Sequence, residues 1–259
     1  MLKGLYTAHT GLLNEQHRMD TLTNNLANAT TIGFKKEGAT SQSFADVFAF
    51  KLKDESVGLH NVQWMGINNP GVKIGENYTD YTQGSFRITD NTYDLALGGN
   101  GFFVVEYTNS AGETSTLYTR AGSFTLTIDG YLVDKAGNYV LDQQNRRIQL
   151  DPLHDTAIDE RGVIYQDGEE VAAIQVVDFE DYDYLEKNGD TYFRTVDGAT
   201  QKESNATVNS GYVEMANVQV VQEMVNMISV TRAYEANQKI MQTYDGSLDI
   251  AVNQLGKLQ

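Results

Sequence analysis

Four residues in the middle of the chain, at positions 98–101, have the glycine-rich composition of a loop that binds phosphate. They read Gly-Gly-Asn-Gly, and the backbone N–H groups of such a loop can hold a phosphate when a helix follows it. Here a strand-like run follows, Phe102-Phe103-Val104-Val105, and the Gly-Lys-Ser/Thr ending of a nucleotide-binding loop is missing. The residues therefore predict a tight β turn and no nucleotide cofactor.

An acidic run between residues 178 and 186 has the side chains that bind calcium. Its members are Asp178, Glu180, Asp181, Asp183 and Glu186. The glycine-centred spacing of a calcium loop is missing, and aromatic residues alternate with the acids as they do in a strand with one solvated face. We therefore expect a solvated strand and no bound metal, with calcium as the less favoured interpretation.

Catalysis by two carboxylates is the strongest enzymatic possibility for an acidic, aromatic, β-rich chain, because glycoside hydrolases use such a pair. No pair can be picked out from the sequence. The chain has no Gly-x-Ser-x-Gly elbow, no His-Glu-x-x-His box and no cysteine, and its four histidines are scattered at 9, 17, 60 and 154. We predict no catalytic, cofactor-binding or metal-binding residues and no enzymatic activity. A secreted carbohydrate-binding or carbohydrate-active β-rich protein stays open as the alternative.

The net charge of −16 lies almost entirely in the middle of the 259-residue chain. Residues 1–36 carry +2 and residues 217–259 carry −1, which leaves −17 for residues 37–216. Such an acidic surface repels phosphate backbones, so nucleic acid is not an expected partner. No apolar run is long enough to cross a bilayer, and Thr7, His9 and Thr10 stand where a secretion signal has its apolar core. We therefore expect no integral membrane segment and no cleaved signal peptide.

Both ends of the chain have the seven-residue repeat of a helix with a narrow apolar edge. In residues 217–258, which contain no proline, the repeat positions are Val220, Met227, Tyr234, Met241, Leu248 and Leu255. In residues 1–29 they are Leu5, Leu12, Met19 and Leu26. A helix over residues 217–258 would reach about 60 Å, and one of that length needs a partner beside it. We expect the two terminal helices to pair as a coiled coil, of which an intramolecular helix pair is the simplest form.

Strand patterns fill the chain between these helices. From residue 76 to residue 195, short aromatic and β-branched runs alternate with turns such as Asp129-Gly130 and Asp167-Gly168, which predicts an antiparallel meander or barrel-like domain. Residues 36–75 show no periodicity and, with residues 196–216, are expected to form an extended connecting arm. The prediction is an α+β fold in three parts: a terminal helical domain over 1–35 with 217–259, the arm, and a β-rich outer domain over 76–195.

Specific runs at both ends and in the middle of the chain resemble the bacterial flagellar rod and hook protein family. They are NNLANATTIGFK at 24–35, QGSF at 83–86, DLAL at 94–97, GNGFFVV at 99–105, YTRAGSF at 118–124, GYVE at 211–214, EMVNMI at 223–228 and RAYEAN at 232–237. Within that family the chain length and the run VVQEM at 220–224 are most similar to the distal rod proteins, although Met215 and Ala216 depart from the usual pattern.

The resemblance implies a structural subunit of the basal-body rod, exported through the flagellum's own secretion channel to a place outside the cytoplasmic membrane. Copies would assemble with their terminal helices innermost into a hollow axial shaft that transmits torque to the hook. The implied partners are further copies of the chain, neighbouring rod and hook subunits, and the export apparatus.

We expect contacts between copies to use eight apolar positions on the two helices. These assembly residues are Leu5, Leu12, Met19, Leu26, Met227, Tyr234, Met241 and Leu248. A single helix pair with so narrow an edge buries little area, so stacking of copies is expected to bury the flanking positions too. The flanking positions are Leu2, Leu13, Val221, Ile228 and Ile240.

Overall fold

The computed structural model describes residues 2–52, 62–109 and 112–255. These residues form two compact units, the first from Met1–Leu26, Glu37–Asp80 and Gln219–Gln259, and the second from Ala27–Lys36 and Tyr81–Val218. The helix predicted over 256–258, His60, and the side chains of Leu2 and Leu255 lie outside what is described.

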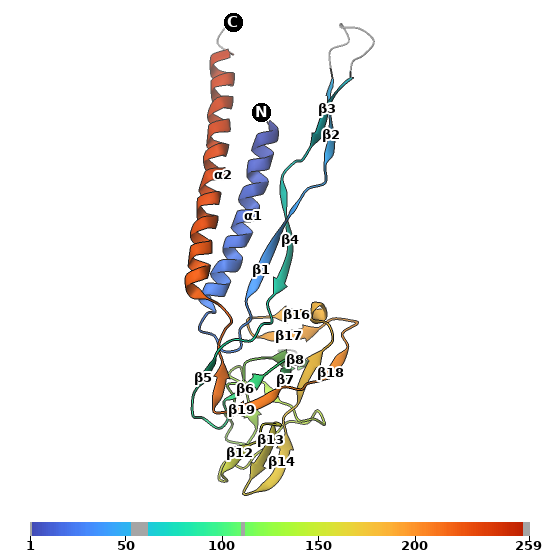
Figure 1. Ribbon diagram of the computed structural model, residues 1–259, viewed down its shortest axis with the longest axis vertical. Coiled ribbons are helices and arrows are strands. Elements are labelled where there is room, and N and C mark those ends of the chain that lie inside the picture. Colours follow the sequence, from blue (N-terminus) through green and yellow to red (C-terminus); the bar gives the residue numbers. More distant parts are fainter. Residues whose placement is uncertain (1, 53–61, 110–111, 256–259) are drawn as a thin grey trace. The chain divides into compact units, whose positions relative to one another are not determined.

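The first unit contains both terminal helices, α1 (Leu2–Ala27) and α2 (Val220–Leu255), as the repeats predict. The two helices lie side by side and run antiparallel (Figure 1), because Gly4 of α1 faces Tyr244 of α2 and Gly11 faces Asn237. A glycine inside a helix costs about 1 kcal/mol relative to alanine. At both positions, however, a β-carbon would meet the side chain of α2, so the glycines permit a close approach of the helices.

An antiparallel ribbon, two strands wide, completes the first unit. It is built from two successive pairs of strands: β1 (Glu37–Ser43) with β4 (Val72–Thr79), and β2 (Val47–Leu52) with β3 (Val62–Asn68). The ribbon runs along α1 (Figure 1), where His17 Nε2 lies 3.0 Å from Asn77 Oδ1 and Thr7 Oγ1 donates a hydrogen bond to the Pro70 carbonyl. The described part of residues 36–75 thus contains paired strands, and the three-part division of the chain stays a prediction.

The second unit contains the remaining strands. They are β5 (Phe86–Ile88), β6 (Leu95–Gly98), β7 (Phe102–Thr108), β8 (Thr114–Thr119), β9 (Thr125–Leu126), β10 (Leu132–Val133), β11 (Tyr139–Val140), β12 (Thr156–Ile158), β13 (Val163–Gln166), β14 (Glu169–Ala173), β15 (Val176–Phe179), β16 (Leu185–Asn188), β17 (Tyr192–Thr195), β18 (Gln201–Glu203), β19 (Thr207–Ser210) and β20 (Tyr212–Glu214), with a 3-10 turn η2 (Tyr182–Tyr184). The pairings between strands are antiparallel, as predicted.

The strands of the second unit form an open arrangement. The main sheet has the order β16-β17-β8-β7-β11-β10-β9, and β15 pairs with both β7 and β18. Within the described residues the two outermost strands, β16 and β9, do not pair with each other. The prediction of a barrel-like sheet is therefore wrong. The order is also not a simple meander, because β17 returns to pair with β8 across a long stretch of chain.

Strand β7 is the centre of the core, because its side chains are buried on both faces. Successive side chains of a strand point to opposite faces. Phe103 and Val105 accordingly pack in one apolar cluster, and Phe102 and Val104 in another. This explains why the sequence reads as a continuous apolar run here instead of alternating.

Candidate assembly interface

The eight predicted assembly residues lie on two neighbouring helices, four on α1 and four on α2. Each of them is half-buried within one copy of the chain. Gly4 and Gly11 of α1 face α2, and they immediately precede Leu5 and Leu12. Because successive helical residues are about 100° apart, these two leucines flank the contact with α2. The structure therefore leaves apolar surface on them, and their role in assembly stays a prediction.

The fully buried face of α1 is small and polar. It consists of Asn14, Thr21 and Asn25, while Ala8 is buried on a neighbouring face. Asn25 Nδ2 donates to the Glu37 carbonyl at 2.7 Å, and the Glu37 N–H donates to Asn25 Oδ1 at 2.9 Å, so one side chain fixes the start of β1 against the helix. The apolar repeat did not reveal this face, although the unusual asparagines at the end of α1 were its signal.

The first turns of α2 have one buried and one exposed face. Glu223 and Val230 are buried, and an acidic side chain in the first turn is favoured by the helix dipole. On the opposite face Val221, with 77% of its surface exposed, is followed by three further exposed apolar residues. We call these four residues the α2 patch. They are Val221, Met224, Val225 and Ile228, at the i, i+3, i+4, i+7 spacing of a single helix face.

A second exposed apolar surface lies on the β2–β3 hairpin. Phe48 and Ile67 are directly opposite each other across the two strands, and 66% and 64% of their surfaces are exposed. We call this pair the hairpin patch. Of the flanking residues that the sequence predicted, Leu13, Val221, Ile228 and Ile240 are exposed as well.

Residues 33–35, which follow α1, are anchored inside the second unit. Gly33 has a φ of 71° and its N–H donates to the Glu214 carbonyl at 2.8 Å. A β-carbon on Gly33 would overlap the backbone of Ala121, so only glycine fits both the conformation and the space. Phe34 is completely buried, with Lys187 Nζ 4.1 Å from the centre of its ring.

A buried ionic cluster joins three distant parts of the chain. Glu214 Oε1 lies 2.7 Å from Lys35 Nζ, and Glu214 Oε2 lies 3.3 Å from Arg120 Nη1. All three side chains are at most 3% exposed. Lys35 also donates to the Thr82 carbonyl, and Arg120 donates to the Gly99 carbonyl at 2.8 Å. Sequence reasoning missed this cluster, because nothing marks residues so far apart in the chain as neighbours.

The glycine-rich loop at 98–101 connects β6 to β7, as the sequence predicts for a turn. Gly99 and Gly101 both have positive φ angles, 111° and 144°. The Gly99 carbonyl accepts the hydrogen bond from Arg120, so the loop contributes to the ionic cluster. Its glycines allow the positive φ angles that this connection between two strands requires.

The acidic run at 178–186 is divided among three elements, so the single solvated strand expected from the sequence is wrong. Asp178, in β15, is buried and accepts a hydrogen bond from the Tyr182 hydroxyl at 2.7 Å. Asp181 caps η2 by accepting from the Asp183 N–H, which bends the chain away from β15. Across the described ranges, no three histidine, aspartate or glutamate side chains gather to hold a metal ion.

Two tyrosines of the second unit hold their protons unusually tightly. Burial, reinforced by the hydrogen bond to Asp178, raises the pKa of Tyr182 to about 12. Burial and a 2.6 Å hydrogen bond to Asp134 Oδ2 likewise raise the pKa of Tyr192. In both cases an ionised phenol would lie beside a carboxylate, so these contacts act as structural hydrogen bonds at neutral pH.

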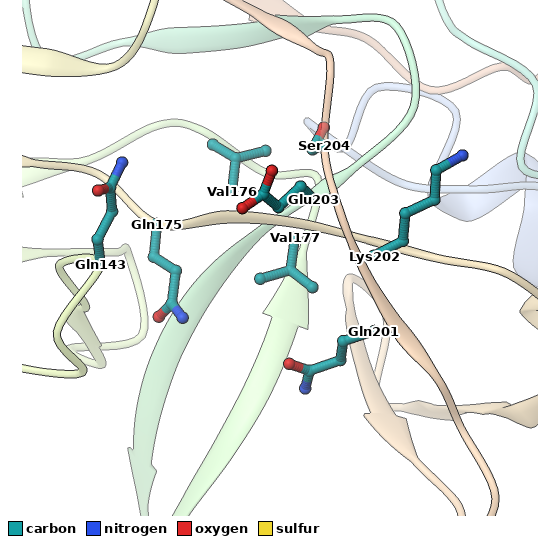
Figure 2. Close-up of a pocket in the computed structure, with 8 residues that line it drawn as sticks. All are labelled: Gln143, Gln175, Val176, Val177, Gln201, Lys202, Glu203 and Ser204. Carbon is teal, nitrogen blue, oxygen red and sulfur yellow. The ribbon is translucent and has the colours of Figure 1, made fainter.

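A cavity of about 610 Å³ lies in the second unit. Three glutamines, two valines, a lysine, a glutamate and a serine line it (Figure 2). Gln201 Nε2 donates to the Tyr118 hydroxyl, and Ser204 Oγ donates to the Asn100 carbonyl. The serine is thus committed to the loop at 98–101. Lys202 and Glu203 also line the cavity, which therefore offers charged as well as hydrogen-bonding groups.

Neither α1 nor α2 is both long and apolar enough to cross a bilayer, and the rest of the described chain contains no other candidate helix.

Three segments of the chain match models of known protein families. Residues 5–35 match the flagella basal body rod protein family, residues 96–166 match the D1 domain of flagellar hook protein FlgE/F/G, and residues 209–255 match the C-terminal region of flagellar basal body rod FlgEFG proteins. Each segment contributes one member of the buried ionic cluster, respectively Lys35, Arg120 and Glu214.

Full-length relatives give the same association. The flagellar basal-body rod protein FlgF of Caulobacter vibrioides is 33% identical over 260 residues, which cover 100% of both chains. The flagellar hook-basal body complex protein FlhO of Bacillus subtilis is 30% identical, again over 100% of both chains. The flagellar basal-body rod protein FlgG of Bacillus subtilis is 30% identical over 98% of this chain and 99% of its own.

Proposed function

The chain belongs to the flagellar basal-body rod protein family, and from this we propose that it self-assembles through its first unit into the axial shaft that transmits torque to the hook. As a member of that family it is a structural subunit of the flagellar basal body. The proposal concerns how the subunit assembles and what the assembled shaft does.

The observation that carries the proposal is that the first unit has almost no apolar core. Among the described side chains, only two of the 28 buried apolar residues, Ala8 and Val230, belong to it. By contrast, 15 of the 24 exposed large apolar residues lie in this unit. Helices gain most of their stability from packing of an apolar face, so the first unit needs surfaces from other copies.

We propose that α1 and α2 pair as a coiled coil and that neighbouring copies cover its edges. The eight assembly residues are half-buried in one copy. Complete burial of a large apolar side chain contributes about 1.5–3 kcal/mol. Covering the part of each residue that is still exposed, about a third or less, adds at most about a third of that. Summed over many copies, such increments would give a stiff shaft without depending on any single site.

The proposed partners follow from the same surfaces. They are further copies of the chain, neighbouring rod and hook subunits, and the flagellar export apparatus through which we propose the chain leaves the cytoplasm. We also keep the three-part division as a proposal: helices over 1–35 and 217–259 nearest the axis, an arm over 36–75 with 196–216, and a β-rich outer domain over 76–195. No catalytic activity is part of this function.

A distal position in the rod is a further proposal, based on the run at 220–224. Relatives named FlgF and FlgG both match the full chain, so the two positions need a direct test. The distal position is supported if this chain restores motility to a strain that lacks its own FlgG but not to a strain that lacks FlgF. The reverse result assigns the subunit to the FlgF position.

The alternative, a carbohydrate-binding or carbohydrate-active β-rich protein, predicts saccharide binding by the second unit. The cavity of the second unit, with its three glutamines, is the surface that it would use (Figure 2). This alternative gives no reason for a first unit with an exposed apolar surface. Saccharide binding by a chain that stays monomeric at every concentration would favour it.

The substitution Met227→Asp tests the assembly proposal. It places a charge on a half-buried edge of α2, where burial without a partner is unfavourable by about 2 kcal/mol or more. We expect the second unit to stay folded, as measured by near-ultraviolet circular dichroism, while electron micrographs show no filaments.

Ile128→Asp is the matched control, because Ile128 is fully exposed in the second unit and undergoes the same apolar-to-acidic change. This variant should form filaments like the unmodified chain. Filaments of normal length from Met227→Asp would contradict the assignment of the helix edge.

A further inference from the structure

The two unpartnered apolar surfaces of the first unit lie at its opposite ends. Gly71, just beyond the β2–β3 hairpin, packs on Thr10 in the first half of α1, so the hairpin continues past the N-terminal end of that helix (Figure 1). The α2 patch lies at the other end, because α2 is antiparallel to α1 and begins beside its last turns. Within one copy, the hairpin patch and the α2 patch therefore cannot cover each other.

Both surfaces are also unusually free of charge for a chain of net charge −16. Between residues 219 and 231 the only charged residue is Glu223, which is buried. In the two hairpin strands the only charged residue is Lys51. A two-stranded hairpin has little stability of its own in water, so an uncharged apolar partner surface would stabilise this one.

We propose that the hairpin patch of one copy packs on the α2 patch of the next copy along the helix axis. Two different surfaces at opposite ends of one unit make a heterologous contact, which repeats without closing and produces an open polymer. The contact would be formed by Phe48 and Ile67 on one side and by Val221, Met224, Val225 and Ile228 on the other. The inference rests on the proposed assembly function and specifies which copy meets which surface.

The chain has no cysteine, so introduced cysteines report on this contact alone. We expect the full-length double variant Phe48→Cys/Val225→Cys, assembled and then oxidised, to give a ladder of covalent dimers, trimers and longer species on denaturing gels. A mixture of the two single variants should give dimers only. Phe48→Cys mixed with Ile128→Cys is the control and should give no cross-link.

A second measurement covers the possibility that cysteines in the contact fail to meet for local reasons. Phe48→Glu is expected to raise the critical concentration for assembly at least about tenfold. Adding Val225→Lys in the same chain should reverse at least half of this increase on a logarithmic scale, because opposite charges then meet across the contact. Val225→Lys combined with Ile128→Glu should restore nothing.

The outcomes separate this contact from the general proposal. Polymers that form normally, with neither a ladder nor charge rescue, overturn the end-to-end contact and leave the assembly function standing. Dimers from Phe48→Cys alone, without a ladder from the double variant, indicate a symmetric contact and also overturn it. Failure of the unmodified chain to assemble at any concentration overturns both proposals.

Discussion

Glu214 links three segments of the chain within the second unit. Its one carboxylate contacts two buried cations, Lys35 from the N-terminal part of the sequence and Arg120 from the middle. Taking charges out of water is unfavourable by several kcal/mol per ion, so the cluster holds residues 33–35 in place only while all of its hydrogen bonds are made. The arrangement fixes the position of residues 33–35 within the second unit.

Removal of the Glu214 charge should therefore lower the free energy of unfolding more than removal of one of the two cations. We expect Glu214→Gln to lower the free energy of unfolding by about 3–5 kcal/mol, since it removes the one carboxylate that contacts both buried cations. Lys35→Met leaves the Arg120 pair intact and should cost less. Urea denaturation followed by circular dichroism measures both. The exposed pair Arg194–Glu186 supplies the control, because Arg194→Met should cost less than about 1 kcal/mol.

The space around Gly33 can be separated from its backbone conformation. Gly33→Ala adds a β-carbon at a φ of 71° and against the backbone of Ala121, whereas Gly137→Ala adds one at a φ of 87° with nothing within 4 Å. A left-handed conformation costs a non-glycine residue about 1–2 kcal/mol. We expect Gly137→Ala to lower the free energy of unfolding by that amount and Gly33→Ala to lower it clearly more. Urea denaturation measures both. Equal losses would show that the backbone of Ala121 shifts freely.

At the scale of elements, α2 begins with one buried and one exposed face, whereas β7 is buried on both faces. The Asn25 side chain bonds α1 to β1, and the Tyr182 hydroxyl bonds η2 to β15 through Asp178. Both are hydrogen bonds between elements, and the second depends on a group that titrates.

The bond between η2 and β15 should weaken at alkaline pH. The pKa of Tyr182 is raised to about 12 in the folded chain, against about 10 for an unfolded tyrosine. The folded state therefore holds the proton more tightly, so this contribution to stability is complete below pH 10 and is lost as the pH rises through 12. Urea midpoints between pH 9 and pH 12 measure the loss. Tyr182→Phe should flatten this dependence, whereas Tyr107→Phe, at an exposed tyrosine, should not.

For the whole molecule, the two units differ in what holds them together. The second unit has two apolar clusters and the ionic cluster, so it carries its own core. The first unit has helices and a ribbon with little buried apolar surface. We therefore expect the second unit to fold independently, and we propose that assembly depends on the first.

A fragment of residues 27–218 should show this difference. It removes both terminal helices, keeps Lys35 and Glu214, and retains Asn217, whose Oδ1 accepts from the Lys36 N–H at 2.7 Å. We expect a soluble monomer that unfolds cooperatively, as measured by sedimentation over a concentration series and by thermal melting. The full-length chain should assemble over the same series. A fragment that is unfolded, or that polymerises like the full chain, would contradict this separation.

The sequence by itself determined the elements whose pattern is local. The seven-residue repeats located α1 and α2, and the turn residues located most strands of the second unit, because periodicity and turn chemistry depend on neighbours along the chain. The eight assembly residues were chosen on the same basis, and their partners in other copies are still a matter of prediction.

Only the tertiary structure decided what depends on residues far apart in the chain. The pairing of β17 with β8, the polar buried face of α1 and the cluster of Lys35, Arg120 and Glu214 have no local pattern, because the energies that favour them arise when distant segments meet in a water-poor interior. For the same reason, the exposed faces at the two ends of the first unit became recognisable only after the buried faces were known.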